Sequence, residues 1–422
     1  VDFVVEFHTF LVYNRNKVKF NKLTNTGVLK MEPSIYLDNS ATTPLKKEVL
    51  DKMMPYLTEN YGNPSSIYSI GRSAKAAIDA ARIQVANAIG AQPAEIYFTG
   101  CGSEADNWAI KGIARAKEKK GKHIISSAIE HHAVLHTLNY LEKQGFSVTY
   151  LPVDEFGKIS LTDLEEAIRP DTILITIMTA NNEVGTIEPI SEIGAIAKKH
   201  NITFHTDAVQ AVGAMELDVK KMNIDMLSMS AHKFGGPKGV GALYVRNGVR
   251  PEIFMHGGAQ ERARRAGTEN VASIVGMGEA IALATRNISE KAEKLCKLRD
   301  YLIKNIMEKI PYVKLNGHPT DRLPGNVNFS FSYIEGESLL LMLDLNGIAA
   351  SSGSACTSGS LDPSHVLLAL GLPHETAHGS LRISIGDYNT KEEIDKVIAL
   401  LPGIVQRLRD MSPLYEEVKN KQ

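Results

Sequence analysis

The sequence has 422 residues, 43% of them hydrophobic, which is enough for two or three domains with large buried cores. Its 47 Lys and Arg residues nearly balance its 48 Asp and Glu residues, so no net field favours binding to nucleic acid or to an anionic membrane. The three cysteines are far apart, and no stretch reaches the roughly 18 uninterrupted apolar residues of a membrane helix. We expect a globular, cytoplasmic protein without a disulfide framework, with no membrane partner and no direct nucleic-acid partner.

Residues 1–30 differ from the rest of the chain, because they are rich in aromatic residues and precede Met31. The stretch has one Arg, no Ser and two acidic residues, Asp2 and Glu6, whereas a mitochondrial transit peptide is rich in Arg and Ser and poor in acid. We expect an extension outside the fold, either an artefact such as upstream translation or an ordered extension, rather than a targeting segment.

From Lys122 onward, short apolar runs alternate with helical patterns, which is typical of a mostly parallel sheet flanked by helices. The expected strands and helices are, in chain order, 123–129, 133–143, 172–178, 190–200, 201–205 and 225–230. Polar residues follow each apolar run, and the ends of parallel strands converge on one crevice where ligands bind. These polar residues are Glu130 and His131, Asn181 and Asn182, Asp207 and Gln210, and His232 and Lys233.

After about residue 288 the pattern changes to a long amphipathic helix with one apolar face, expected over 289–310. A smaller α+β domain is expected to follow. Its other elements are the apolar segments 326–332 and 381–385 and a closing helix over 391–408. The predicted division of the chain is an extension over 1–30, a large domain over 43–288, and a small domain made of 31–42 plus 289–422.

A Gly-rich turn at 100–102 precedes a helix that carries Ser103, Glu104 and Asp106 in its first turn. The exposed N–H groups of such a turn can hold an anion. The alternative is an ordinary strand-to-helix turn with a cap. A P-loop and a dinucleotide fingerprint are both excluded, because no GK[ST] follows and the GxGxxG spacing is absent.

The segment SMSAHKFGGPKGVGALYV places Lys233 at a strand end, after Ser230 and His232 and before a rigid Gly-Gly-Pro turn. A lysine amine aimed into the crevice can form a Schiff base with a carbonyl cofactor such as pyridoxal phosphate. The alternative is a solvated lysine in a Gly turn.

Asp207 ends the preceding strand, in the segment FHTDAVQAVG. A buried carboxylate ~4 Å from a protonated pyridine nitrogen attracts it by about 4 kcal/mol at an effective dielectric near 20, which keeps the ring an electron sink. A cap or salt-bridge role is the alternative for a lone buried Asp. Gln210, three residues later, could donate to the ring oxygen.

His131 ends a strand in AIEHHAVLH and could lie flat on the pyridine face. The i, i+4 spacing of His132 and His136 also permits a zinc ligand pair. We do not favour zinc, because HExxH is absent and His136 fits simply on the following helix.

The motifs YLDNSATTP, NNEVGTIEPI, HTDAVQ, SAHKFGGPKG and SSGSACTSGSLDPSHVLLALGL occur in this order along the chain. On these motifs the chain resembles the cysteine desulfurases of the NifS/IscS type, from about Ile35 to the last helix. The resemblance implies the class-V aminotransferase family, a fold-type I pyridoxal phosphate transferase with a large α/β cofactor domain and a smaller α+β domain, and a homodimer with composite sites.

The resemblance also implies a role for individual residues. Lys233 matches the Schiff-base lysine, Asp207 the pyridinium partner, His131 the stacking histidine and Gln210 the ring-oxygen donor. The matched phosphate ligands are Gly102 in the Gly-rich turn, Ser103, Ser230, His232, and Thr268, which the family supplies to the other subunit. The matched substrate carboxylate ligands are Arg382, whose planar fork suits a carboxylate, and Asn182.

Cys356 matches the family's nucleophile. Residues 351–360 are small apart from Cys356 and Thr357, so the segment cannot anchor itself in a core and is expected to be a mobile loop. Without the resemblance, a structural cysteine would be the better interpretation. Cys296 lies on the amphipathic helix with no sign of function, and Cys101 lies in the Gly-rich turn, where its role is open.

The implied reaction removes sulfur from L-cysteine, giving L-alanine and a persulfide on Cys356. The sulfur would pass to an iron-sulfur scaffold protein or to a tRNA-thiolation acceptor. Three alternatives stay open on the sequence: a selenocysteine lyase or other C–S lyase, an aminotransferase, and a non-catalytic docking module.

Overall fold

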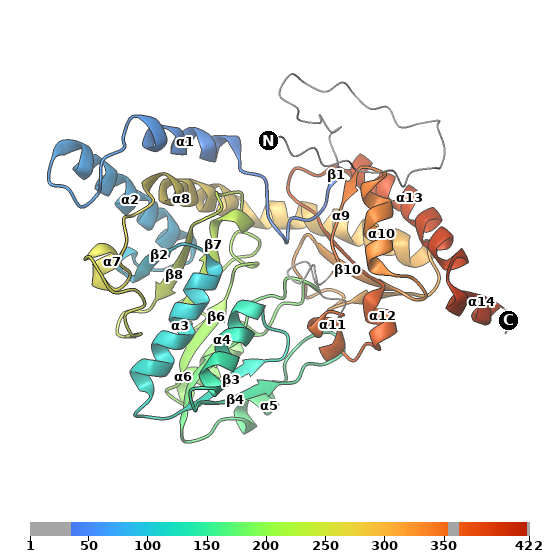
Figure 1. Cartoon of the computed structure of the whole chain (residues 1–422), viewed down its shortest axis with the longest axis horizontal. Helices are drawn as coiled ribbons and strands as arrows, with labels where there is room; N and C mark the ends of the chain where they lie inside the picture. Colours follow the sequence, from blue (N-terminus) through green and yellow to red (C-terminus); the bar gives the residue numbers. More distant parts are fainter. Residues whose placement is uncertain (1–34, 353–362, 420–422) are drawn as a thin grey trace, which may run out of the picture.

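The computed structural model describes residues 35–352 and 363–419. A seven-stranded sheet and a three-stranded sheet lie side by side in it (Figure 1). In the large sheet β8 runs antiparallel to β2 and β7, and the other neighbours are parallel. Its strands, in spatial order, are β2 Ile96–Thr99, β8 Gly241–Val245, β7 Met226–Ser230, β6 Thr203–Asp207, β5 Thr172–Thr176, β3 His123–Ser127 and β4 Ser147–Leu151.

Both faces of the large sheet are covered by helices, because successive strand residues alternate between two apolar cores. Ile124 packs in the core beneath α3 and α4, whereas Ile125 packs in the core of the opposite face, beneath α2, α6 and α8. The helices around this sheet are α1 Lys47–Thr58, α2 Ser69–Ala88, α3 Gly102–Lys117, α4 His132–Glu142, α5 Leu161–Glu166, α6 Ile190–Lys199, α7 Gln260–Ala263 and α8 Val271–Thr285. Two short 3-10 turns, η1 Pro93–Glu95 and η2 Ala231–Lys233, complete this part.

The second sheet is antiparallel, in the order β12-β10-β9, and belongs to a separate apolar core. Its strands are β9 Val313–Asn316, β10 Asn326–Phe331 and β12 Ser380–Ser384, and a parallel pair, β1 Ile35–Tyr36 and β11 Ile348–Ala349, lies nearby. The helices are α9 Ile288–Lys309, α10 Gly336–Asp344, α11 His365–Ala369, α12 His374–His378, α13 Lys391–Asp410 and α14 Pro413–Lys419.

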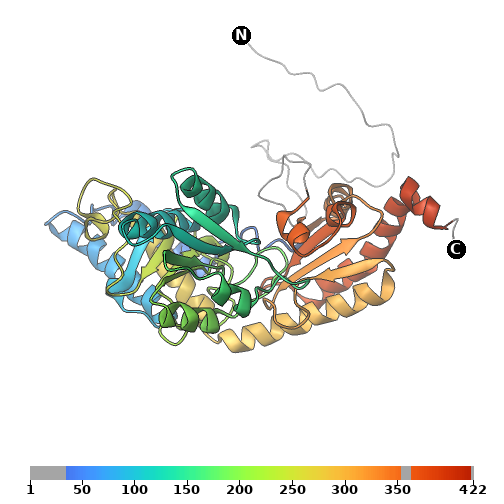
Figure 2. The same ribbon diagram turned by 90° about the horizontal axis from the view of Figure 1, so that it is seen from below.

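Two segments connect the parts. Helix α9 runs along the underside of both (Figure 2), and its buried Leu302 and Ile306 belong to the core of the small sheet. Leu37, directly after β1, packs in the same core, and the chain then crosses to α1 in the large part. The domain boundaries expected from the sequence stay a prediction.

The expected strands and helices occur within a few residues of their predicted bounds, and the closing helix α13 begins at Lys391 as expected. The run predicted over 201–205 forms β6 two residues later, with Asp207 as its last residue. Strands β2, β4 and β8 were not anticipated. No helix among the described residues is long and apolar enough to cross a membrane.

A buried ion pair fixes one edge of the large sheet. The Arg82 guanidinium in α2 binds both carboxylate oxygens of Glu261 at 2.8 and 2.7 Å, and the two side chains are only 7% and 2% exposed. Arg82 also donates to the carbonyl of Ile96, and Glu261 accepts the N–H of Phe98 at 2.9 Å. The pair therefore joins α2, β2 and α7.

Arg82→Ala leaves the Glu261 carboxylate buried without its cation, so we expect a loss of about 3–5 kcal/mol of stability. Thermal unfolding measures it as a large fall of the midpoint temperature. Lys75→Ala on the same helix is the matched control, because the exposed Lys75–Asp79 pair contributes only about 0.5 kcal/mol. Equal effects of the two substitutions would contradict the assignment.

Candidate functional site

The carboxyl ends of β3, β5, β6 and β7 open on a cavity of about 590 Å³, a volume suited to a small organic ligand. Residues from the small part close its other side. The predicted site residues that line it are Gly102, Ser103, His131, Asn182, Asp207, Gln210, Ser230, His232, Lys233 and Arg382. The sequence therefore predicted a set of residues that the fold does bring together.

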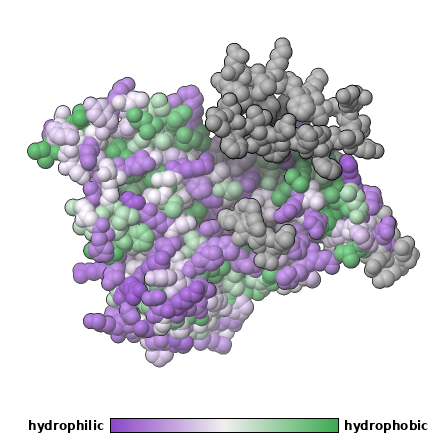
Figure 3. Space-filling model, viewed as in Figure 1, coloured by the Kyte–Doolittle hydropathy of each residue, from purple (hydrophilic) through white to green (hydrophobic). Residues whose placement is uncertain are grey.

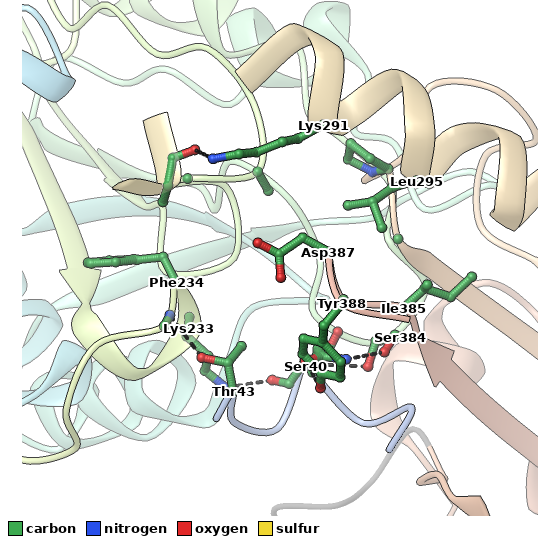
Figure 4. Close-up of a pocket in the computed structure, with 18 of the residues that line it drawn as sticks. Ser40, Thr43, Lys233, Phe234, Lys291, Leu295, Ser384, Ile385, Asp387 and Tyr388 are labelled. Carbon is green, nitrogen blue, oxygen red and sulfur yellow. Dashed lines mark hydrogen bonds between the residues drawn. The ribbon is translucent and has the colours of Figure 1, made fainter. Parts of the chain in front are cut away.

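Lys233 is the last residue of η2, the tight turn that follows β7. The turn needs Gly236, because a Cβ there would lie 2.9 Å from both the carbonyl oxygen and the Cβ of Ala231. The Lys233 Nζ donates to the carbonyl of Ser40 at 2.5 Å (Figure 4) and to that of Ala41 at 2.8 Å. The turn thus aims the amine across the cavity at the segment between the two parts.

A second cavity of about 450 Å³ (Figure 4) shares part of its lining with the first, because Ser40, Gln210 and Lys233 line both cavities. Gln210 also donates to the carbonyl of Ser40, at 3.0 Å. The backbone at Ser40 and the two side chains bound to it therefore belong to the walls of both cavities.

Asp207 is buried at the end of β6, and its Oδ1 accepts the N–H of Val209 at 2.9 Å. Burial raises the pKa of this carboxyl, while the neighbouring His131 and Lys233 act in the opposite direction. The His131 Nδ1 accepts the N–H of Ala133 at 3.1 Å and so caps α4. This bond fixes the orientation of the imidazole in the cavity.

The start of α3 offers a place for a phosphate. Its first residue, Gly102, has no room for a side chain, since a Cβ would lie 2.7 Å from the Cγ2 of Val209. Glu104 turns back to accept the N–H of Gly100 at 2.8 Å and pairs with Arg265 at 2.7 Å, so its charge is neutralised. The helix start keeps its favourable potential for an anion.

His232 lies beside this place and contacts the Thr42 hydroxyl at 3.1 Å. Burial, followed by repulsion from Lys233 and Lys238, lowers the pKa of His232 to about 4, so the imidazole is neutral at pH 7. A neutral ring can still donate one hydrogen bond to a phosphate. A lysine amine, a ring-facing carboxylate and a phosphate cradle are the groups that pyridoxal phosphate needs, so the residues fit this cofactor.

Arg382 enters the cavity from β12 of the small sheet. Its Nη2 binds Asp38 Oδ1 at 2.8 Å, its Nη1 donates to the carbonyl of Asn182 at 3.2 Å, and its buried Nε has no hydrogen-bond partner among the described residues. These two bonds use two of the five N–H donors of the guanidinium, which is therefore held from two sides and keeps donors for a further partner. Such a group can bind a carboxylate that enters the cavity.

Three buried carboxyl groups of the cavity received no role from the sequence: Asp106, Glu130 and Glu183. Burial raises the pKa of Glu130 to about 8 and that of Glu183 to about 7. Asp106 and Glu130 could have been singled out, since one lies in the first turn of a helix and the other ends an apolar run. Their burial could not be read from these positions.

Three histidines gather at the wall of the cavity. The His132 ring lies 5.0 Å from that of His136 and 4.8 Å from that of His365. Within residues 35–352 and 363–419, no three His, Cys, Asp or Glu side chains are arranged to hold a metal ion. Burial lowers the pKa of both His132 and His365, aided by their mutual repulsion with the other histidines.

Two predicted residues are not placed in this cavity. Cys356 lies outside the described residues, so its position stays a prediction. Thr268 is exposed in the segment between α7 and α8 and does not line the cavity of its own chain. Of the other cysteines, Cys101 caps α3 through a weak contact from the Glu104 N–H to its sulfur, at 3.4 Å, and Cys296 is partly buried on α9.

Residues 35–397 match the family described as aminotransferase class V. The chain is 63% identical to cysteine desulfurase IscS of Methanosarcina thermophila, covering 90% of this chain and 94% of that protein. It is 61% identical to cysteine desulfurase IscS of Clostridium botulinum strain Hall, covering 93% of this chain and the whole of that protein.

Solved structures give the same result. A NifS-like protein superposes with a TM-score of 0.84 at 40% identity, covering 89% of this chain and all of that one. A NifS-like protein from Rickettsia africae superposes with a TM-score of 0.81 at 34% identity, covering 88% and 99% of the two chains. These likenesses confirm the fold class predicted from the sequence.

We expect Gly236→Ala to impair attachment of the cofactor, because the added methyl overpacks the turn that aims Lys233, at a cost of about 1–3 kcal/mol. Borohydride reduction followed by mass spectrometry of the Lys233 peptide measures the attached fraction. Gly403→Ala in α13 is the control, since its added Cβ meets nothing within 4 Å. The proposed role of the turn fails if both variants retain the full attached fraction.

Proposed function

The chain belongs to the class-V aminotransferase family and is a pyridoxal-phosphate-dependent cysteine desulfurase, and from this premise we propose how its residues divide the reaction. The observation that carries the proposal is the meeting of Lys233, Asp207 and Arg382 at one cavity, from two neighbouring strands of the large sheet and one strand of the small sheet. The substrate is L-cysteine, and the products are L-alanine and a persulfide sulfur.

Lys233 is the residue that holds the cofactor covalently. When bound, pyridoxal phosphate supplies the carbonyl that condenses with the substrate amine and a protonated ring that withdraws electrons from Cα. The amine must leave the carbonyls of Ser40 and Ala41 to take up this role. As a free amine, the Lys233 Nζ would then take the proton from the substrate Cα.

Asp207 would hold the proton on the ring nitrogen, and His131 would contact the ring and help to move protons. Gln210 donates to the ring oxygen. The phosphate is held by Gly102 and Ser103 at the start of α3 and by Ser230 and His232 beside it. Their positions around one cavity support this assignment.

Arg382 binds the substrate carboxylate through N–H groups that its bonds to Asp38 and Asn182 do not use, and Asn182 assists it. Asp38 fixes the guanidinium on the opposite side. Because Asp38 and Asn182 hold the guanidinium in place, Arg382 orients the bound substrate before reaction. This orientation lowers the entropic part of the activation barrier.

Cys356 is the sulfur acceptor. Its thiolate forms an S–S bond to the substrate sulfur while the Cβ–S bond breaks; the electron pair of that bond stays on Cβ, which takes up a proton, and the Lys233 Nζ returns to Cα the proton that it took. L-alanine leaves, and the persulfide remains on Cys356. The next acceptor is an iron-sulfur scaffold protein or a tRNA-thiolation protein of the cytoplasm.

The working unit is a homodimer in which Thr268 of one chain binds the phosphate of the other. Two observations support this assembly. Thr268 is exposed and lies away from the cavity of its own chain. Apolar side chains are also exposed over α1 and the loop that follows it (Figure 3), among them Tyr61, 76% exposed, and Ile67, 89% exposed. A second subunit would cover such a surface.

Cys356→Ser tests the division between the two halves of the reaction. We expect the variant to show the absorbance change of the cofactor on addition of L-cysteine, because Lys233 is intact, and to form no persulfide. Visible spectroscopy and mass spectrometry of the protein measure the two events. Sulfide release at the wild-type rate would remove Cys356 from the mechanism.

Arg382→Lys should lower kcat/KM for L-cysteine roughly thirtyfold, mainly through KM, because a point charge replaces a charge-assisted fork bond of about 2 kcal/mol. Steady-state kinetics measure the change. The visible band of the bound cofactor is the internal control and should be retained. An unchanged KM would show that Arg382 does not bind the substrate.

A further inference from the structure

Three carboxyl groups are buried side by side at the floor of the catalytic cavity. Asp106 comes from α3, Glu130 from the turn that follows β3, and Asp207 from β6; they are 1%, 0% and 7% exposed. Repulsion from Asp207 raises the pKa of both other carboxyl groups, and repulsion from Glu130 also raises the pKa of Asp106. Three buried anions so close together would be costly, so the protons must be divided among them.

Asp106 has no charged partner. Its Oδ1 has no hydrogen-bond partner among the described residues, and its bond is to the uncharged Ser228. The nearest basic group is His205, whose Nε2 lies 3.7 Å from that Oδ1. Both His205 nitrogens are already engaged by hydroxyl groups, those of Ser228 at 2.9 Å and Thr176 at 2.8 Å. Burial lowers the pKa of His205 to about 3, so it is neutral and forms no ion pair.

The two carboxyl oxygens of Glu130 differ in their hydrogen bonds, as expected for a protonated acid. Its Oε1 accepts two bonds, from the Ser127 hydroxyl at 2.7 Å and from the Met178 N–H at 2.9 Å, whereas its buried Oε2 has no hydrogen-bond partner among the described residues. A carboxylate would leave half of its charge unsolvated on Oε2. A carboxylic acid places the O–H on that atom and keeps Oε1 as the acceptor.

Asp207 differs from both, because the groups that can be positive face it. His131 and Lys233 stabilise its ionised form, and the Val209 N–H donates to its Oδ1. The charge of the cluster therefore belongs on Asp207. Burial opposes ionisation of all three carboxyl groups. Groups that carry or can take up a positive charge lower mainly the pKa of Asp207.

We propose that Asp106 and Glu130 each hold a proton in the working enzyme and act as positioning residues that leave Asp207 as the single anion of the cavity floor. The inference rests on the proposed function, because it gives a purpose to the charge of Asp207. When Asp106 and Glu130 are protonated, Asp207 has two uncharged neighbours in place of two negative charges that would repel it. One negative charge then faces one protonated ring nitrogen.

Infrared difference spectroscopy of the holoenzyme at neutral pH tests the proposal directly. A protonated buried carboxyl has a C=O stretching band that shifts on exchange into deuterated water. Asp106→Asn and Glu130→Gln, which keep the shape of the neutral acid, should each remove one such band and leave the carboxylate bands unchanged. Loss of a carboxylate band in either variant would overturn the assignment for that residue.

Coupling to Asp207 gives a second readout. In Asp207→Asn the repulsion from Asp207 is gone, so the Asp106 acid band should disappear at a pH at least about one unit lower than in the wild type, a tenfold change in proton affinity. An unshifted titration would show that Asp106 is a structural residue with no connection to Asp207.

Thermal stability gives a third readout, with a defined sign. A carboxyl whose folded pKa lies above its unfolded pKa binds more protons in the folded state, so its contribution to stability falls as pH rises between the two values. We therefore expect the wild type to lose stability relative to Asp106→Asn as pH rises. The difference in midpoint temperature of thermal unfolding, variant minus wild type, should increase from pH 4 to pH 8. Glu261→Gln is the control, because loss of the Arg82 ion pair should lower the midpoint throughout this range.

Failure of the proposed function is separable from failure of this inference. If borohydride trapping finds no cofactor on Lys233, the proposed function fails whatever the infrared bands show. If trapping succeeds and the acid bands are absent at neutral pH, the proposed function stands and the protonation of Asp106 and Glu130 is wrong.

Discussion

The site depends on keeping a negative charge on Asp207 in a place from which water is almost excluded. Burial disfavours the ionised carboxyl, and the molecule offsets this with His131, Lys233 and the backbone N–H of Val209. These groups follow β3, β6 and β7, whose carboxyl ends a parallel sheet brings to one edge. The α/β architecture is thus a requirement of the chemistry as well as a scaffold for it.

The segment that follows β1 supplies the opposite wall. It carries Asp38, which holds Arg382, and the Ser40 carbonyl, which holds Lys233 and Gln210. The residues proposed to bind cofactor and substrate are therefore held by one short stretch of chain. A shift of this stretch would therefore change cofactor binding and substrate binding together, although the residues proposed for them lie in different parts of the fold.

Much of the fold and of the candidate site was predictable from the sequence, because the patterns that indicate them lie in short stretches of chain. Parallel strands read as apolar runs ending in polar residues, which located Lys233, Asp207 and His131 at one crevice. The partial engagement of Arg382 by Asp38 was not predictable, because it joins residues 344 positions apart. The burial that decides the charge of Glu130 is likewise a property of tertiary packing. Strand β8, antiparallel to its neighbours, carries no pattern that distinguishes it from a parallel strand.

The backbone conformation around α7 was also not predicted from the sequence. Glu261, Arg262 and Ala263 all have positive φ, at 46°, 58° and 61°, a conformation that costs non-glycine residues of order 1 kcal/mol or more each.

The structure offsets that strain through the buried bidentate pair between Arg82 and Glu261, which fixes the first strained residue to α2 and β2. The half-buried pair between Lys46 and Asp387, by contrast, contributes less because solvent partly screens it. The strong ion pair therefore stands at the base of the segment that leads to Thr268, the residue proposed to reach the other subunit. A segment that must present one side chain to a partner needs a rigid base, and the Arg82–Glu261 pair provides it.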